Sequence, residues 1–275
     1  MKIIHLTDTH LIEPGYLLYG LDPALRLKQA IQSINEHHAD ADKVIITGDL
    51  THWGQISAYE TLRECIGTLI PECTLLLGNH DNREIFRDIF PDALQDNFGF
   101  VQGCVETEQG VFIYLDTNQP GTHVGWYCDQ RFEWLNEQLD QYAGQNKFIF
   151  MHHPPFLIGL EPMDRISLLQ KDKFLGALEK HKTSVRHIFF GHVHRPISGN
   201  WQGISFSTLR ATSHQVWLDF TEKGEIPGSH EPPAYSVVLI KDESVVVHTH
   251  DFLDDSKKFS LGALDALTLK EITDV

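Results

Sequence analysis

The chain has 275 residues, a length that fits one large domain or two modest ones with a buried core. With 41% hydrophobic, 22% charged and 10% aromatic residues, its composition is that of a globular protein and excludes disorder, collagen and coiled coil. Its 22 Lys and Arg against 38 Asp and Glu give a net charge of −16, so no basic surplus is available to bind a nucleic-acid polymer. A small anionic substrate stays compatible with this charge if bound metal ions supply local positive charge.

No segment has the pattern of a secreted or membrane-spanning protein. The first apolar run, residues 3–6, is too short for a signal sequence or a membrane span, and polar residues follow it at once. The four cysteines form no CxxC pair and no dense framework, so neither a thiolate zinc site nor a disulfide scaffold is indicated. We therefore expect a cytoplasmic protein with free thiols and no membrane partner.

Apolar runs and helical patterns alternate along the first part of the chain. The runs are rich in Ile, Val, Leu and Phe without clean alternation, which is typical of strands covered on both faces; they are 3–6, 44–46, 75–77, 148–151 and 188–190. Apolar spacing predicts helices over 23–37, 59–69 and 132–142, the first with Asp22 as N-cap and Pro23 at its first position. This alternation predicts an α/β fold.

The later part of the chain has a different residue composition. Runs at 204–207, 235–240 and 244–250 are rich in β-branched residues and predict a second, partly antiparallel strand set, hence a two-sheet sandwich. The Gly- and Pro-rich stretch 221–233 is predicted to be a loop, and loops of this length are often functional lids. We expect residues 1–255 to form a single catalytic domain and 256–275 a tail, with Leu261, Leu264 and Leu267 on one side of a helix that docks on that domain.

Five polar clusters each begin where an apolar run ends. Since loops from the carboxyl ends of neighbouring strands converge at the ligand-binding edge of an α/β sheet, we expect these clusters to lie together. Taken alone, each histidine would more often be a core residue, but five ordered clusters indicate a metal site. The clusters are Asp8-Thr9-His10, Gly48-Asp49, Gly78-Asn79-His80-Asp81, His152-His153-Pro154-Pro155 and Gly191-His192-Val193-His194.

The residue types predict a centre with two metal ions. One carboxylate has to bridge the ions, and Asp49 is the candidate. Imidazole, carboxylate and amide oxygen without thiolate suit Mn, Fe, Co or Zn, as two divalent or mixed-valence ions. Two roles stay open for His153: it either forms part of the pocket wall or contacts the residues that orient the ligands. Asp8, His10 and His194 complete the first site, and Asn79, His152 and His192 the second.

In this order, the motifs DTH, GD, GNHD, HHPP and GHVH resemble those of the calcineurin-like metallophosphoesterase superfamily over residues 8–194. Within it, the chain is similar to the branch of class III cyclic-nucleotide phosphodiesterases and glycerophosphodiesterases, through residues 18–20, Gly121-Thr122 with Gly125-Trp126, 151–155 and 212–215. The resemblance implies a two-sheet β-sandwich flanked by helices (αββα), with a dinuclear site at the carboxyl ends of its strands. It also implies a homo-oligomer.

The same resemblance assigns roles to the residues of the clusters. It implies that Asp8, His10, Asp49, Asn79, His152, His192 and His194 hold the metal ions. It implies that His80 stabilises the transition state, with Asp81 as the residue that orients it and Asn79 beside it on the substrate. His214, beyond the last motif, is expected either in the substrate pocket or in a turn. Tyr19, Trp53 and Trp126 are expected either to stack on a base or to lie in the core.

These inferences predict a metal-dependent hydrolase of small phosphodiesters, either 3′,5′-cyclic nucleotides such as cAMP or glycerophosphodiesters. A metal-bound hydroxide is expected to attack phosphorus in line, with Asn79 and His80 stabilising the charge on the oxygens. Two alternatives stay open. One is a phosphomonoesterase of the same fold, and the other is a metal-binding regulatory protein whose catalytic centre is vestigial.

Overall fold

The computed structural model describes residues 1–261, and its first sheet is built around three of the predicted strands. β1 runs parallel to β2, and β2 runs parallel to β3. Two strands from the end of the chain extend this sheet in antiparallel pairs, giving the order β13-β12-β1-β2-β3. Their bounds are β1 Lys2–Leu6, β2 Lys43–Thr47, β3 Cys73–Leu76, β12 Tyr235–Ile240 and β13 Val245–His250.

The second sheet has the order β4-β5-β6-β7-β9-β8 and a parallel centre from β5 to β9. Its antiparallel edges are β4, which forms a hairpin with β5, and β8, which pairs with β9. The strands are β4 Gly103–Thr107, β5 Gly110–Tyr114, β6 Lys147–Phe150, β7 Val185–Phe189, β8 Ser198–Trp201 and β9 Ile204–Ser207. A separate short pair joins β10 Gln215–Val216 to β11 Gly228–Ser229.

The helices agree with the predicted ones, with shifts at some ends. α1 (Pro23–His37) has the predicted bounds, and the Asp22 side chain accepts from the Leu25 amide at 3.1 Å. α2 (Ile56–Ile66) ends three residues before the predicted boundary at 69, because the chain leaves the helix at Gly67. α4 runs over Asp129–Gln141. The sequence did not predict α3 Arg83–Ile89, α5 Glu161–Asp164, α6 Lys171–Leu178 or the 3₁₀ turn η1 Glu179–His181.

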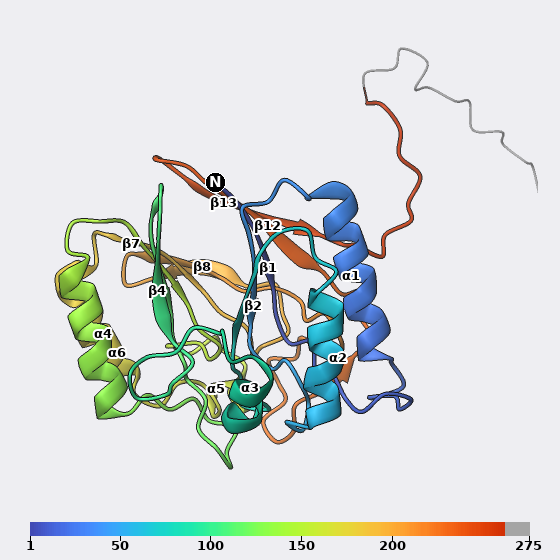
Figure 1. The fold of residues 1–275 in the computed structure, drawn as a ribbon, viewed down its shortest axis with the longest axis horizontal. Helices are drawn as coiled ribbons and strands as arrows, with labels where there is room; N and C mark the ends of the chain where they lie inside the picture. The colour runs from blue at the N-terminus through green and yellow to red at the C-terminus, as the bar shows by residue number, and fades with distance from the viewer. Residues whose placement is uncertain (262–275) are drawn as a thin grey trace, which may run out of the picture.

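The elements form four layers, with helices outside and the two sheets between them. Figure 1 shows α1 and α2 on one side of the strands and α4 and α6 on the other. Three apolar clusters fill the layers: one joins α1, α2 and α3 to the first sheet, one lies between the sheets, and one joins α4 and α6 to the second sheet. Both faces of each sheet are therefore covered, which confirms the αββα sandwich and explains the continuous apolar runs.

The late strands do not form a sheet of their own, and this corrects the expectation from the sequence. β9, with its partner β8, joins the second sheet beside β7, whereas β12 and β13 join the first sheet beside β1. The reason is that a β-branched run specifies a strand but not its partner. Each sheet is completed by strands from distant parts of the chain.

The stretch 221–233 is irregular as predicted, except for Gly228 and Ser229 in β11. Residues 256–261 are irregular and exposed, so the predicted tail helix does not begin at Ser256. The positions of Leu264 and Leu267 lie outside the described residues. The division into a catalytic domain over 1–255 and a tail over 256–275 stays a prediction.

Candidate metal centre

The predicted clusters lie at the carboxyl ends of parallel strands from both sheets, so that one site forms across the common edge of the sandwich. Six of the seven predicted ligands are buried, and Asn79 is half-buried. The first sheet contributes Asp8 and His10 after β1, Asp49 after β2 and Asn79 after β3; the second contributes His152 after β6, and His192 and His194 after β7.

The backbone of these loops is strained at the ligand positions. Residues other than glycine rarely adopt positive φ, and they keep it only where the surrounding structure holds them there. Backbone hydrogen bonds from Asp8 N to Gly48 O (3.1 Å) and from His10 N to Asp49 O (2.9 Å) tie the first two loops together. Positive φ occurs at Asp8 (53°), His10 (45°), Asp49 (47°), His192 (69°) and His194 (48°).

Asp49 is central in the cluster. Its Oδ2 atom lies 3.6 Å from His10 Nε2 and 3.3 Å from His152 Nε2, so one oxygen faces both halves of the predicted centre. Its Oδ1 atom accepts from the His80 amide at 2.9 Å. Burial raises the pKa of Asp49, but the nearby His152 and His80 lower it by a larger amount. The pKa of Asp49 therefore lies well below its usual range, and the carboxylate is ionised. Burial lowers the pKa of His152, but Asp49 raises it to about 9.

The first half of the centre brings Asp8, His10 and His194 together beside Asp49. The Nε2 atoms of His10 and His194 are 3.1 Å apart, and His194 Nε2 lies 3.3 Å from Asp8 Oδ1. One ligand atom from each of the four residues lies within 4.8 Å of the others. The predicted grouping for the first site is therefore present in the structure.

The second half brings Asn79, His152 and His192 together. Asn79 Oδ1 lies 3.2 Å from His152 Nε2, and the rings of His152 and His192 are 5.1 Å apart. His192 Nε2 is buried and has no hydrogen-bond partner among residues 1–261. Burial, with His153 and His152 nearby, holds the pKa of His192 well below its usual range, so the ring keeps a free lone pair.

The two halves fit a pair of divalent ions. An orphaned imidazole nitrogen in a buried site is costly unless something binds it, and a cation satisfies it. The donors are carboxylate oxygens, an amide oxygen and imidazole nitrogens, which suit first-row divalent metals. His153 lies beside this group, but both of its ring nitrogens are engaged, Nδ1 by Thr117 Oγ1 (2.7 Å) and Nε2 by the His123 carbonyl (3.2 Å). His153 therefore supports the wall of the site.

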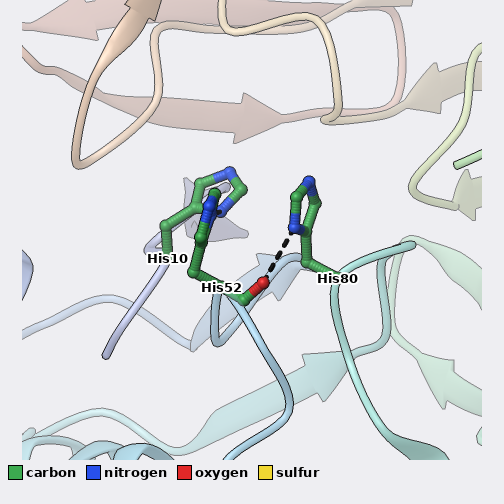
Figure 2. A group of neighbouring side chains, drawn as sticks. All are labelled: His10, His52 and His80. Atoms are coloured by element: carbon green, nitrogen blue, oxygen red, sulfur yellow. Dashed lines mark hydrogen bonds between the residues drawn. The ribbon is translucent and has the colours of Figure 1, made fainter. Parts of the chain in front are cut away.

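His80 stands beside the centre, and a backbone carbonyl orients it. Its Nδ1–H donates to the carbonyl oxygen of His52 at 2.9 Å, as Figure 2 shows. The expectation that Asp81 orients His80 is wrong: no hydrogen bond joins the two side chains within the described chain. Asp81 instead accepts from the amides of Gly78 (2.9 Å), Leu50 and Thr51 (3.0 Å each) and from Tyr59 Oη (2.9 Å). It ties the loops after β2 and β3 together.

His214, which was expected either in the substrate pocket or in a turn, lines a cavity beside the cluster. Its ring is 4.7 Å from Tyr19 and 4.9 Å from His10, and its carbonyl oxygen accepts from His194 Nδ1 at 2.7 Å. Burial, with His194 nearby, lowers the pKa of His214 to about 2. The residue therefore holds a predicted ligand with its backbone and faces the cavity with its ring.

Sequence reasoning missed two histidines, His52 and His123. His52 Nδ1 lies 3.0 Å from His10 Nδ1, and His123 Nδ1 lies 2.8 Å from Asn79 Nδ2. The only available signal was position: His52 follows Asp49 in the same loop, and His123 lies between Gly121-Thr122 and Gly125-Trp126, two pairs that carry the family resemblance. Neither position has a spacing that predicts a contact, because both contacts join different loops.

Residues 1–196 match one protein family, described as calcineurin-like phosphoesterase. The chain belongs to this family. Membership implies divalent metal ions, and the buried His and Asp cluster of this phosphoesterase could hold them.

Relatives of this phosphoesterase match nearly all of its length. It is 41% identical over 276 residues to a protein from Rhodopseudomonas palustris named a probable cyclic nucleotide phosphodiesterase, covering 99% of this chain and 100% of that protein. It is 30% identical over 254 residues to a protein from Arcobacter nitrofigilis named a probable glycerophosphodiester phosphodiesterase, covering 90% and 92%. The crystal structure of a dimetal phosphatase from Danio rerio shares the fold, with a TM-score of 0.66 at 14% identity over 92% of this chain and 97% of that one.

Two cavities meet at the cluster of this phosphoesterase. The first, of about 770 Å³, is lined by five of the seven predicted ligands and also by Met163, Ile166, Val216 and Ile226. The second, of about 930 Å³, shares His52, Asn79, His80 and His123 with the first, and both volumes suit small-molecule ligands. In the part of the chain that the structure describes, no helix has both the length and the apolar character needed to cross a membrane.

Proposed function

We propose that this phosphoesterase hydrolyses small phosphodiesters, either 3′,5′-cyclic nucleotides or glycerophosphodiesters, with two divalent ions. The observation that carries the proposal is the position of Asp49 Oδ2, at 3.6 Å from His10 Nε2 and 3.3 Å from His152 Nε2. A single carboxylate oxygen between two ligand sets is the arrangement that a bridged pair of ions requires. The names of the two relatives, a cyclic nucleotide and a glycerophosphodiester phosphodiesterase, support the diester class.

The proposed ligands divide between two sites that share Asp49. Asp8, His10 and His194 would hold one ion, and Asn79, His152 and His192 the other. When bound, the ions supply positive charge for the phosphoryl oxygens and acidify a water. Mn, Fe, Co and Zn all suit these donors. The carboxylates leave part of the charge of two divalent ions uncompensated, which explains how a chain with a net charge of −16 binds an anion.

His80 is the proposed proton donor to the leaving alcohol. Because its Nδ1–H is bound to the His52 carbonyl, the ring exchanges its second proton only at Nε2. A protonated ring can give the Nε2 proton to the departing oxygen while Nδ1 keeps its hydrogen bond. Asn79 and His214 line the same cavity and are proposed to contact the substrate. The homo-oligomer implied by the resemblance stays a prediction.

The test compares bis(p-nitrophenyl) phosphate with p-nitrophenyl phosphate at equal metal loading, followed by cyclic nucleotides and glycerophosphodiesters. We expect the diesters to be hydrolysed faster than the monoester. His80→Ala should lower turnover by about 10²- to 10⁴-fold, the contribution of a general acid, and should leave metal content unchanged. Faster hydrolysis of the monoester would support a phosphomonoesterase. Protein that holds two ions and hydrolyses neither ester would support the regulatory alternative.

A further inference from the structure

Four of the seven proposed ligands are held in place at a second polar atom, and the groups that hold them are of two kinds. The Nδ1 atoms of His152 and His194 lie 2.7 Å from the carbonyl oxygens of Thr47 and His214. A histidine that binds metal through Nε2 commonly donates its other ring N–H to a fixed acceptor, which sets the orientation of the ring. These two ligands therefore depend on the backbone for their orientation.

His10 and Asn79 are held by histidine side chains instead. His10 Nδ1 lies 3.0 Å from His52 Nδ1, and Asn79 Nδ2 lies 2.8 Å from His123 Nδ1. His10 belongs to the first proposed site and Asn79 to the second. Each half of the centre thus has one ligand whose orientation depends on a histidine outside the ligand set.

The direction of both hydrogen bonds follows from the chemistry of the groups. A neutral His10 that binds metal through Nε2 carries its proton on Nδ1, so His10 donates and His52 Nδ1 accepts. The Asn79 amide nitrogen can only donate, so His123 Nδ1 accepts, and this leaves Asn79 Oδ1 directed toward His152. Both supporting histidines therefore act as acceptors through Nδ1.

Other contacts hold the two supporting rings in place. The ring of His52 stacks on that of His80, with centroids 4.6 Å apart and planes at 19°, and the same residue binds His80 Nδ1 through its carbonyl (Figure 2). The ring of His123 also lies beside His80, at 4.8 Å. Its carbonyl oxygen accepts from His153 Nε2 at 3.2 Å.

We propose that His52 and His123 are positioning residues for the two halves of the metal centre, His52 fixing the ring of His10 and His123 fixing the amide of Asn79. This inference rests on the metal centre of the proposed function. It assigns a separate effect to each residue: loss of the acceptor at His52 weakens the first ion, and loss of the acceptor at His123 weakens the second. Replacing a hydrogen-bond partner of this kind typically lowers metal affinity by about 10- to 100-fold.

The test replaces each acceptor and measures metal binding directly. His52→Phe and His123→Phe keep a flat ring and remove the acceptor, whereas His52→Asn and His123→Asn place an amide oxygen near the position of Nδ1. His248→Phe, at an exposed position on β13, is the control for the change of residue type. Each protein is freed of metal and titrated with Co²⁺, and the visible absorption of the bound ion distinguishes the two ligand sets.

We expect each Phe variant to bind one Co²⁺ with wild-type affinity and the other about 10- to 100-fold more weakly, with different residual spectra for the two variants. The Asn variants should recover most of the affinity, and His248→Phe should match the wild type. Wild-type affinity in both Phe variants, weakening of the same ion in both, or no recovery with Asn would overturn the proposal. Because the titration uses no substrate, a protein that shows these affinities but hydrolyses no diester would refute only the proposed function.

Discussion

A methyl group added at Gly48, next to Asp49, should disturb both the fold and the metal centre. Gly48 has φ +96°, and a Cβ built there would lie 2.6 Å from the Gly78 amide nitrogen, 2.6 Å from His152 Nδ1 and 2.8 Å from the Leu77 carbonyl carbon. Ordinary van der Waals contact begins at 3.4 Å, and two of the three neighbours are backbone atoms, which cannot rotate away. The loops after β2 and β3 would have to separate.

Two other glycines allow the contributions to Gly48→Ala to be measured separately. Gly144 has φ +84° and no atom near its Cβ position among the described residues, so Gly144→Ala measures backbone strain alone, about 1–2 kcal/mol of lost stability. Gly176 lies in α6 with no positive φ and open space, so Gly176→Ala should stabilise the protein by up to about 1 kcal/mol. Gly48→Ala adds overpacking of about 1–3 kcal/mol to the backbone strain, a total loss of roughly 2–5 kcal/mol.

The assay is urea unfolding of the three variants at pH 7, together with metal content and diester turnover. Because the added methyl group pushes against His152 Nδ1, which lies 2.7 Å from Thr47 O, the second ion should bind more weakly in Gly48→Ala. A displacement of about 1 Å at a catalytic group can cost 10²-fold in rate. The reasoning is refuted if Gly48→Ala is no less stable than Gly144→Ala, or if it keeps wild-type metal content and turnover.

Three further predictions concern the carboxylate bridge, the core and the metal ions. Asp49→Ala should abolish the pairing of the ions, and metal analysis that still finds two tightly bound ions per chain would contradict the bridge. His5 and His187 lie between the sheets; burial and His187 lower the pKa of His5 to about 3, and burial lowers that of His187 to about 4. The unfolded chain takes up a proton at each of these histidines near pH 6.5, whereas the folded chain does so only at the lower pKa. The free energy of unfolding therefore has its full value above pH 6.5. As the pH is lowered from 6.5 to the folded pKa values, it falls by up to about 1.4 kcal/mol per pH unit for each histidine. His5→Phe should reduce that slope between pH 6 and 4, measured by urea unfolding, and an unchanged slope would argue against a neutral buried His5. Removal of metal with a chelator should lower Tm, and re-addition at 100 times the Kd of each ion should restore about 2.7 kcal/mol of stability per ion, whereas an unchanged Tm would argue against ions bound to the folded state.

Much of the site could be predicted from the sequence because its residues sit at fixed places relative to strand ends. A buried strand has a recognisable apolar run, and the residues just after it lie at its carboxyl end wherever the strand is placed in the sheet. The positions of Asp8, Asp49 and His192 follow from this local rule, and the structure brings them to one edge. The apolar runs without alternation predicted strands covered on both faces, whereas the two-sheet sandwich was expected from the late strands and implied by the family resemblance.

Contacts between loops could be decided only by the tertiary structure. Local spacing specifies where His52 and His123 lie in their loops, but their bonds to His10 and Asn79 depend on how distant strand ends are placed. The same reason explains the error at Asp81: the family resemblance implied that it orients His80, whereas its carboxylate accepts hydrogen bonds from amides of the loop after β2. The positions of β12 and β13 in the first sheet have the same explanation. Which strands pair depends on residues far apart in the sequence, so residues 235–250 do not determine their partners by themselves.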